Sequence, residues 1–187
     1  SSSIVQNFIP TRKSTSRKGD NGIVLVVGGS YIYHGAPVLS SLAALRCGTD
    51  LVYTCVPKIN VTPTRAISPN LIVIPLVDQK LTLGAVKKLV GALPRNLHSA
   101  TIGMGLAIQE KNSLLHLVKS LLDRDVRLSL DASALIPEVL PILAHKNVVV
   151  TPHAGEFKRL FGDVPSDSNL ERIKLVEENA LKHGITI

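Results

Sequence analysis

Two glycine-rich segments have residue types that suit the binding of an anion. The first runs from Gly28-Gly29-Ser30-Tyr31 to Gly35-Ala36-Pro37, where we expect Pro37 to open a helix. Glycines let the backbone approach a ligand closely, and the free N–H groups of a first helical turn attract anions. The G-x-G-x-x-G spacing of a dinucleotide loop is absent from the sequence. Glycines that merely turn the chain explain the segment equally well.

The second segment is Gly103-Met104-Gly105-Leu106, which follows a short apolar run. A strand again leads into small residues and then toward a helix. The segment predicts either a loop that approaches a ligand or a tight turn whose glycines take positive φ angles.

A third segment, Thr151-Pro152-His153-Ala154-Gly155-Glu156-Phe157, places an imidazole at the start of a predicted helix. We expect Thr151 to cap the helix that Pro152 opens. His153 would then lie in the first turn, where it can donate a hydrogen bond to an oxygen-rich ligand. Glu156 can accept hydrogen bonds there or favour the helix N-terminus electrostatically.

Asp131 follows another apolar run and can serve two purposes. Its carboxylate can hold a metal-bound water or a sugar hydroxyl, or it can cap the helix that follows. The sequence has no Cys/His cluster with metal-ligand spacing, no P-loop lysine motif and no serine nucleophile elbow.

Strands that alternate with helices must position these segments. Apolar β-branched runs predict strands and helical spacing predicts helices. The expected strands are 23–27, 51–56, 71–76, 100–102, 126–130, 148–150 and 184–187, and the expected helices are 37–47, 83–93, 114–122, 154–161 and 170–182. This order predicts a mostly parallel sheet with right-handed crossovers and helices on both faces. Each candidate segment directly follows a strand, so all should gather at the carboxyl edge of the sheet.

Composition favours one globular domain that can bury a substantial core. The 187 residues are 45% hydrophobic, and no apolar run is long enough to cross a bilayer. Much of the +7 net charge lies in residues 1–21, which we expect to form an irregular basic arm. Three Phe, three Tyr and no Trp argue against nucleic acid as a partner. Cys47 and Cys55 are expected to be buried thiols in the cytoplasm.

The final run, residues 184–187, reads as a buried strand without its following helix. A buried strand needs partners on both faces. We therefore expect residues 22–187 to be an incomplete domain whose C-terminal part is missing.

Taken in order, the motifs resemble those of one enzyme family. They are Val24-Leu25-Val26-Val27-Gly28-Gly29-Ser30, Tyr33, Gly35-Ala36-Pro37, Ala43-Ala44-Leu45-Arg46 with Gly48, Gly103-x-Gly105-Leu106, Asp131-Ala-x-Ala134-Leu135 and Thr151-Pro152-His153-x-Gly155-Glu156-Phe157. From about residue 10 to 187 the chain resembles the ADP- or ATP-dependent NAD(P)H-hydrate dehydratase family. Met104 and Ser133 depart from the family pattern, which usually has Pro and Asp there. The resemblance implies a three-layer ribokinase-like fold.

It also implies a repair activity on NADH or NADPH that has gained water across a ring double bond. The terminal phosphoryl group of ADP or ATP moves to the added hydroxyl, phosphate leaves and the reduced cofactor is restored, with Mg²⁺ neutralising phosphoryl charge. ADP is the expected donor because the sequence carries no organelle-targeting segment, and a homo-oligomer, commonly a tetramer, is expected for the complete protein.

The family's substrate contacts map here onto Ala36, a glycine of the Gly103–Gly105 turn (Gly105 is favoured) and His153. Asp131 and Glu156 are possible accessory groups. The nucleotide loop and the catalytic aspartate are expected beyond Ile187, so the 187-residue piece is expected to be inactive alone.

Two other functions fit the same fold. One is a ribokinase-like kinase acting on a sugar or a vitamin precursor, against which the 151–157 motif argues. The other is a non-catalytic nucleotide-binding module that has lost its base.

Overall fold

The computed structural model describes residues 11–163 and 168–187. Their centre is a six-stranded parallel sheet with the strand order β3-β2-β1-β4-β5-β6. The strands are β1 (Ile23–Val27), β2 (Leu51–Pro57), β3 (Leu71–Leu76), β4 (Ser99–Ile102), β5 (Arg127–Leu130) and β6 (Val148–Val150). The predicted parallel sheet is confirmed.

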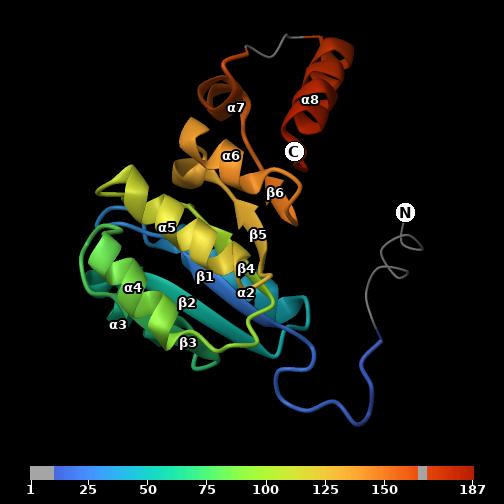
Figure 1. The fold of residues 1–187 in the computed structure, drawn as a ribbon. Helices are drawn as coiled ribbons and strands as arrows, with labels where there is room; N and C mark the ends of the chain where they lie inside the picture. Colours follow the sequence, from blue (N-terminus) through green and yellow to red (C-terminus); the bar gives the residue numbers. More distant parts are fainter. Residues whose placement is uncertain (1–10, 164–167) are drawn as a thin grey trace.

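Helices and short 3₁₀ turns connect the strands. They are α2 (Gly35–Arg46), η1 (Lys58–Asn60), α3 (Val61–Ile67), α4 (Leu83–Ala92), α5 (Lys111–Leu122), η2 (Ala132–Ala134), η3 (Pro137–Val139), α6 (Leu140–Leu143), α7 (Ala154–Phe161) and α8 (Asn169–His183). In Figure 1, α4 and α5 cover one face of the sheet, while α2 and α3 lie on the other.

The two faces of β1 bury different cores because side chains alternate along a strand. Leu25 and Val27 belong to the larger cluster, which includes Leu117 of α5. Val26 belongs to a smaller cluster with Val61 of α3. A strand buried on both faces explains why β1 is an uninterrupted apolar run. The three-layer architecture is therefore held by two cores, one on each side of the sheet.

Three local predictions are wrong. Helix α2 begins at Gly35, two residues before Pro37, and His34 is its N-cap. Cys47 is exposed rather than buried because it caps the end of α2 at the surface, whereas Cys55 is buried, and this burial raises the pKa of its thiol. The final run does not form a strand: Thr186 makes one parallel bridge to Val149 beside the edge strand β6.

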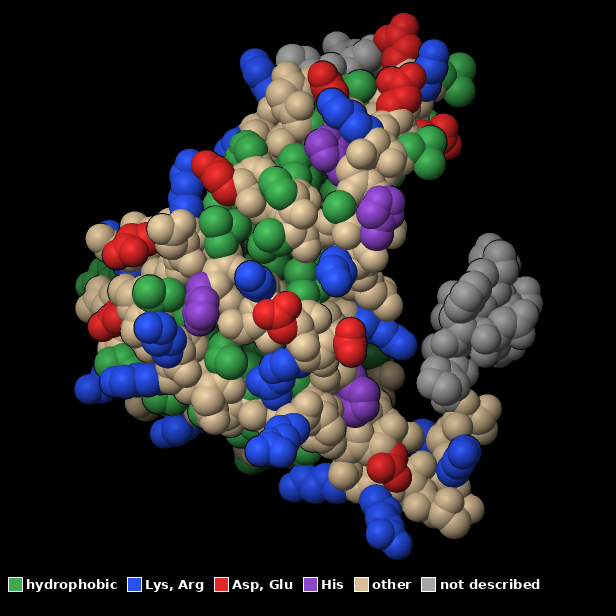
Figure 2. Space-filling model, viewed as in Figure 1, with side chains coloured by type: hydrophobic (Ala, Val, Ile, Leu, Met, Phe, Trp, Pro, Cys, Tyr) green, Lys and Arg blue, Asp and Glu red, His purple; other side chains and the backbone are tan. Residues whose placement is uncertain are grey.

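The described part of the basic arm, residues 11–21, has turns but no helix or strand, whereas residues 1–10 lie outside the described residues. On the face shown in Figure 2, Lys and Arg side chains are scattered among neutral and acidic ones rather than gathered in one stripe. Positive charge is thus spread over several elements of this face.

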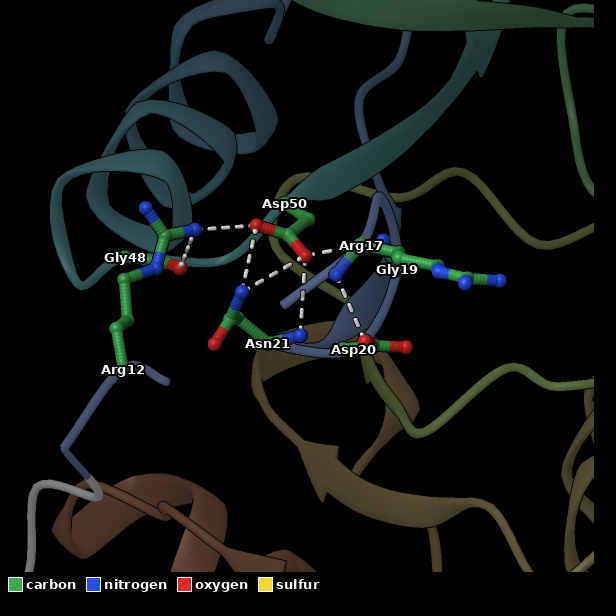
Figure 3. Close-up of polar contacts among 7 residues, drawn as sticks. All are labelled: Arg12, Arg17, Gly19, Asp20, Asn21, Gly48 and Asp50. Atoms are coloured by element: carbon green, nitrogen blue, oxygen red, sulfur yellow. Dashed lines mark hydrogen bonds and ion pairs between the residues drawn. The ribbon is translucent and has the colours of Figure 1, made fainter. Parts of the chain in front are cut away.

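Asp50, at the start of β2, fixes this arm to the amino edge of the sheet (Figure 3). Its Oδ2 accepts hydrogen bonds from the backbone N–H groups of Gly19 at 2.9 Å and Asn21 at 3.0 Å. The Asn21 side-chain amide donates to the same oxygen at 3.1 Å, and the Arg12 guanidinium forms an ion pair with Oδ1. A single carboxylate therefore organises a segment that has no regular structure of its own.

The arm should detach from the sheet in acid. The hydrogen bond from the Asn21 backbone lowers the pKa of Asp50, although partial burial opposes the shift. A carboxyl group whose folded-state pKa is lowered stabilises the folded arrangement above its unfolded pKa, and this contribution disappears as pH falls through the folded-state pKa. We expect the amide-exchange protection factors of Gly19 and Asn21, measured by NMR, to fall at least about tenfold as the pH is lowered from above the unfolded-state pKa of Asp50 to below its folded-state pKa. Loss of charge-assisted hydrogen bonds implies a decrease of this size.

Asp50→Asn provides the control because it keeps the shape and cannot ionise. Protection at Gly19 and Asn21 should be low in this variant at every pH. Protection in the unaltered chain that stays constant into strong acid would contradict the prediction.

Candidate functional site

The carboxyl edge of the sheet contains the point where the strand order changes direction. From β1 the chain passes to β2 and β3 on one side, and it then crosses over to β4, which pairs with the other side of β1. Ligands of open α/β sheets bind outside the carboxyl ends of the strands at such a point. The loops after β1 and β4 are therefore the place to look for a site.

A hollow of about 480 Å³ lies there. It is lined by residues from the loops after β1, β4 and β5: Ser30, Tyr33, Ala36, Gly105, Leu106, Ala107, Ala132 and Ser133. The structure thus brings Ala36 and Gly105 into one lining although they are far apart in sequence. The lining is mainly small and apolar, which suits an uncharged ring better than a charged group.

Backbone hydrogen bonds join the loops that form this hollow. The Gly29 N–H donates to the Met104 carbonyl at 2.9 Å, and the Gly103 N–H donates to the Val27 carbonyl at 3.0 Å. Within the first loop, the Ser30 N–H donates to the Tyr33 carbonyl at 2.7 Å. The two glycine segments therefore support each other directly.

Asn60, the last residue of η1 after β2, holds the first loop in place and was missed by sequence reasoning. It is only 5% exposed, and its side-chain amide donates to the Ser30 carbonyl at 2.7 Å. The signal available in the sequence was an Asn shortly after Pro57, at the end of a predicted strand. At such a position, a side-chain amide can donate a hydrogen bond to a backbone carbonyl of a neighbouring loop.

Different neighbours exclude a side chain at the two glycines of the second segment. Gly103 has a φ angle of 122°, and a Cβ there would lie 1.9 Å from the Asp131 carbonyl oxygen. Gly105 has a φ angle of 64°, and a Cβ there would lie 2.8 Å from the Cβ of Tyr33. Gly105 lines the hollow and Gly103 does not. Close packing against β5 therefore explains Gly103 without a ligand.

His153 caps α7 instead of Thr151, so the predicted Thr151 cap is wrong. The His153 Nδ1 accepts a hydrogen bond from the Gly155 N–H at 3.1 Å, and the Glu156 Oε2 accepts one from the His153 N–H at 3.1 Å. This reciprocal pair is a capping box. His153 and not Thr151 is the N-cap because His153 directly precedes the helix, where its ring reaches the Gly155 N–H.

The imidazole of His153 is exposed at the same sheet edge but does not line the hollow. Its side chain is 73% exposed, and its Nε2 lies 3.3 Å from the Glu156 Oε1. Since Nδ1 accepts, the neutral ring carries its proton on Nε2. That N–H is a donor presented beside a carboxylate that is itself largely buried.

Asp131 ties the ends of β5 and β6 together. Its Oδ1 accepts a hydrogen bond from the Thr151 hydroxyl at 2.9 Å, and it makes no side-chain cap to η2. The alternative in which Asp131 caps the following helix is therefore wrong. This contact connects the loop that lines the hollow, which includes Ala132 and Ser133, to the segment that carries His153.

The other expected parts of an active site are not assembled by these residues. In residues 11–163 and 168–187, no three His, Cys, Asp or Glu side chains gather into a metal site, so the implied Mg²⁺ finds no such ligand set there. Another hollow, of about 880 Å³, lies at the opposite edge against the arm and includes Asn21, Gly48 and His98. Within the same described stretches, no helix is both long and apolar enough to cross a membrane.

A family model described as NAD(P)H-hydrate dehydratase matches residues 24–187. The chain belongs to the NAD(P)H-hydrate dehydratase family. The match covers every strand of the sheet except the first residue of β1, and it includes all candidate site residues. The family predicted from the motifs is confirmed.

Two relatives of this family are similar over almost the whole chain. The ADP-dependent (S)-NAD(P)H-hydrate dehydratase of Nitrosopumilus maritimus is 83% identical over 184 residues, which cover 98% of this chain and 64% of the relative. The enzyme of the same name from Cenarchaeum symbiosum is 63% identical, with the same coverage. The chain thus spans about 64% of the length of these curated relatives.

Solved structures confirm the ribokinase-like fold of the family. A ribokinase-like superfamily protein from Enterococcus faecalis superposes with a TM-score of 0.78 at 22% identity, covering 99% of this chain and 63% of that one. An ADP/ATP-dependent NAD(P)H-hydrate dehydratase from Bacillus subtilis, co-crystallised with ATP and Mg²⁺, gives a TM-score of 0.79 at 25% identity with the same coverage.

Proposed function

We propose that this chain forms the substrate-binding part of an enzyme that dehydrates hydrated NADH and NADPH, with ADP as the phosphoryl donor and Mg²⁺ as its metal ion. The observation that carries the proposal is the 83% identity to an ADP-dependent (S)-NAD(P)H-hydrate dehydratase. The complete protein is proposed to be a homo-oligomer, with a tetramer as the expected state.

The hollow at the carboxyl edge supports this substrate. A hydrated nicotinamide ring is uncharged and has apolar saturated carbons, and the lining by Ala36, Gly105 and Leu106 offers small apolar surfaces to them. The exposed Nε2–H of His153 can donate to an oxygen of the same ligand from the neighbouring strand end. In this assignment, Asp131 and Glu156 orient the segments rather than contact the ring.

The proposed reaction balances in two steps. First, the added hydroxyl oxygen bonds to the terminal phosphorus of ADP, the bond from that phosphorus to AMP breaks, and a base takes the hydroxyl proton. Then the ring nitrogen lone pair expels phosphate as the carbon–oxygen bond breaks, and loss of a proton from the adjacent ring carbon restores the double bond. Overall the ring loses the elements of water and ADP is converted to AMP and phosphate, so the products are NADH or NADPH, AMP and phosphate.

The 187-residue chain should bind the substrate without converting it. None of the eight residues that line the hollow is a carboxylate or an imidazole, so the lining offers no base for the hydroxyl proton. The test supplies hydrated NADH, ADP and Mg²⁺ and measures binding by calorimetry, and turnover by the return of the near-ultraviolet absorbance of the reduced nicotinamide. We expect heat of binding and no return of absorbance.

Each other result overturns a different part of the proposal. No binding of hydrated NADH or hydrated NADPH would rule out the substrate. Turnover at the rate of a complete family member would rule out the inactivity of the 187-residue chain. Turnover with ATP and none with ADP would rule out the donor.

A further inference from the structure

A second hollow, of about 360 Å³, adjoins the first and differs from it in charge. It is lined by Leu106, Ile108, Gln109, Lys111, Ser133, Ile136 and Arg159. Leu106 and Ser133 line both hollows, so a single ligand can extend from one to the other. The first hollow has no cationic lining residue, whereas the second has Lys111 and Arg159.

Arg159 is fixed by hydrogen bonds to carbonyl groups. From α7, its Nε donates to the Leu135 carbonyl at 3.1 Å, and its Nη2 donates to the Ala132 carbonyl at 2.9 Å. Within the described residues it has no carboxylate partner, so these bonds orient the guanidinium and leave its positive charge uncompensated. The N–H groups not used in these two bonds can still donate to an anion.

Lys111 places a second positive charge at the same hollow. It is the first residue of α5, and its ammonium forms an ion pair with Glu138, which does not line the hollow. The ion pair restricts where the ammonium can lie while most of the Lys111 side chain stays in contact with solvent. An oriented guanidinium and a nearby ammonium are the combination that proteins use to hold phosphate groups.

We propose that the hollow between Lys111 and Arg159 binds a phosphate group of the same dinucleotide whose ring occupies the neighbouring apolar hollow. This inference rests on the proposed function and assigns a binding role to two residues outside the motifs of the sequence. The phosphate is either the pyrophosphate bridge, present in both hydrated cofactors, or the 2′-phosphate, present only in hydrated NADPH.

The experiment measures the Kd of hydrated NADH and of hydrated NADPH by calorimetry for the 187-residue chain and its variants. Lys111→Gln and Arg159→Gln should each raise Kd about tenfold, as loss of one charge-assisted contact implies. Glu138→Gln should lower Kd, because it removes the negative charge that offsets Lys111. This opposite sign is not expected of a variant that merely disturbs the fold.

Matched controls come from the same two helices. Lys119→Gln on α5 and Lys158→Gln on α7 remove one positive charge each from residues that do not line the hollow. Both should change Kd by less than about twofold, as expected of solvent-screened charges. Melting temperatures verify that all five variants are folded, and Lys111→Gln leaves the turn at Ala132 untouched.

The two ligands separate the two phosphates. If Lys111→Gln and Arg159→Gln weaken binding of both ligands equally, the hollow binds the pyrophosphate. If they weaken binding of hydrated NADPH alone, the hollow binds the 2′-phosphate. If the unaltered chain binds both ligands and Lys111→Gln binds them equally well, the phosphate site is overturned and the proposed function stands, even if Arg159→Gln binds more weakly. If the unaltered chain binds neither ligand, the proposed function and this inference both fall.

Discussion

Replacing Gly103 by alanine should destabilise the fold by at least about 3 kcal/mol. The new Cβ would lie 1.9 Å from the Asp131 carbonyl oxygen and 2.8 Å from the Cβ of Ala134. Backbone atoms supply the first of these contacts, so no side-chain rotation can relieve it. The φ angle of 122° adds strain for any residue with a side chain. Thermal unfolding followed by circular dichroism should show a melting temperature lower by about 6–12 °C, or no folded protein at all.

Gly91→Ala is the matched control. Gly91 lies within α4, and a Cβ there would meet no atom within 4 Å. Alanine favours the helix, so this variant should be as stable as the unaltered chain or more stable by up to about 1 kcal/mol. A Gly103→Ala variant that melts together with Gly91→Ala would show that β4 and β5 do not approach each other as described.

Replacing Ala36 by leucine should strongly weaken binding of hydrated NADH and leave the fold intact. Ala36 lies in the first turn of α2 and lines the apolar hollow. A leucine side chain would occupy space that the nicotinamide ring needs, and forcing extra methylene groups into a packed contact costs about 1–3 kcal/mol or more. We therefore expect Kd, measured by calorimetry, to rise on the order of a hundredfold.

Gly35→Leu adds a larger side chain to the same turn at a position that does not line the hollow. A Cβ on Gly35 would meet no atom within 4 Å. Binding should be unchanged in this variant, and both variants should melt close to the unaltered chain. Equal Kd values for Ala36→Leu and Gly35→Leu would show that the ring does not enter this hollow.

The strands were predictable because their apolar, largely β-branched runs leave a simple pattern, even where an edge strand such as β3 or β6 exposes a side chain to solvent. Residues 23–27, 71–76 and 148–150 are strands with the predicted bounds, and all are apolar β-branched runs. Helix α3 was not predicted, because its sequence contains Pro63 and poor helix formers. The 3₁₀ turn η3 was not predicted either, since packing against α5, α6 and α7 rather than local propensity sets it.

The sequence predicted at which edge of the sheet the candidate site lies, but it did not predict most contacts within the site. Parallel strands guarantee that segments following them meet at one edge, so the grouping of the glycine turns followed from the order of elements. The reason for each glycine depends on its neighbours in space: the Asp131 carbonyl at Gly103 and the Tyr33 side chain at Gly105. Those neighbours come from other loops, and spacing along the chain does not reveal them.

The place where the strand order reverses also has a thermodynamic consequence. Three strands precede the crossover and three follow it, and the β1–β4 ladder is the boundary between these halves. Since the apolar hollow takes its walls from both halves, an occupant contacts them simultaneously and favours conformations in which the boundary is closed. Local opening along β1 and β4 and release of the occupant are consequently linked equilibria, and the free energy by which the occupant disfavours opening equals the free energy by which opening weakens binding.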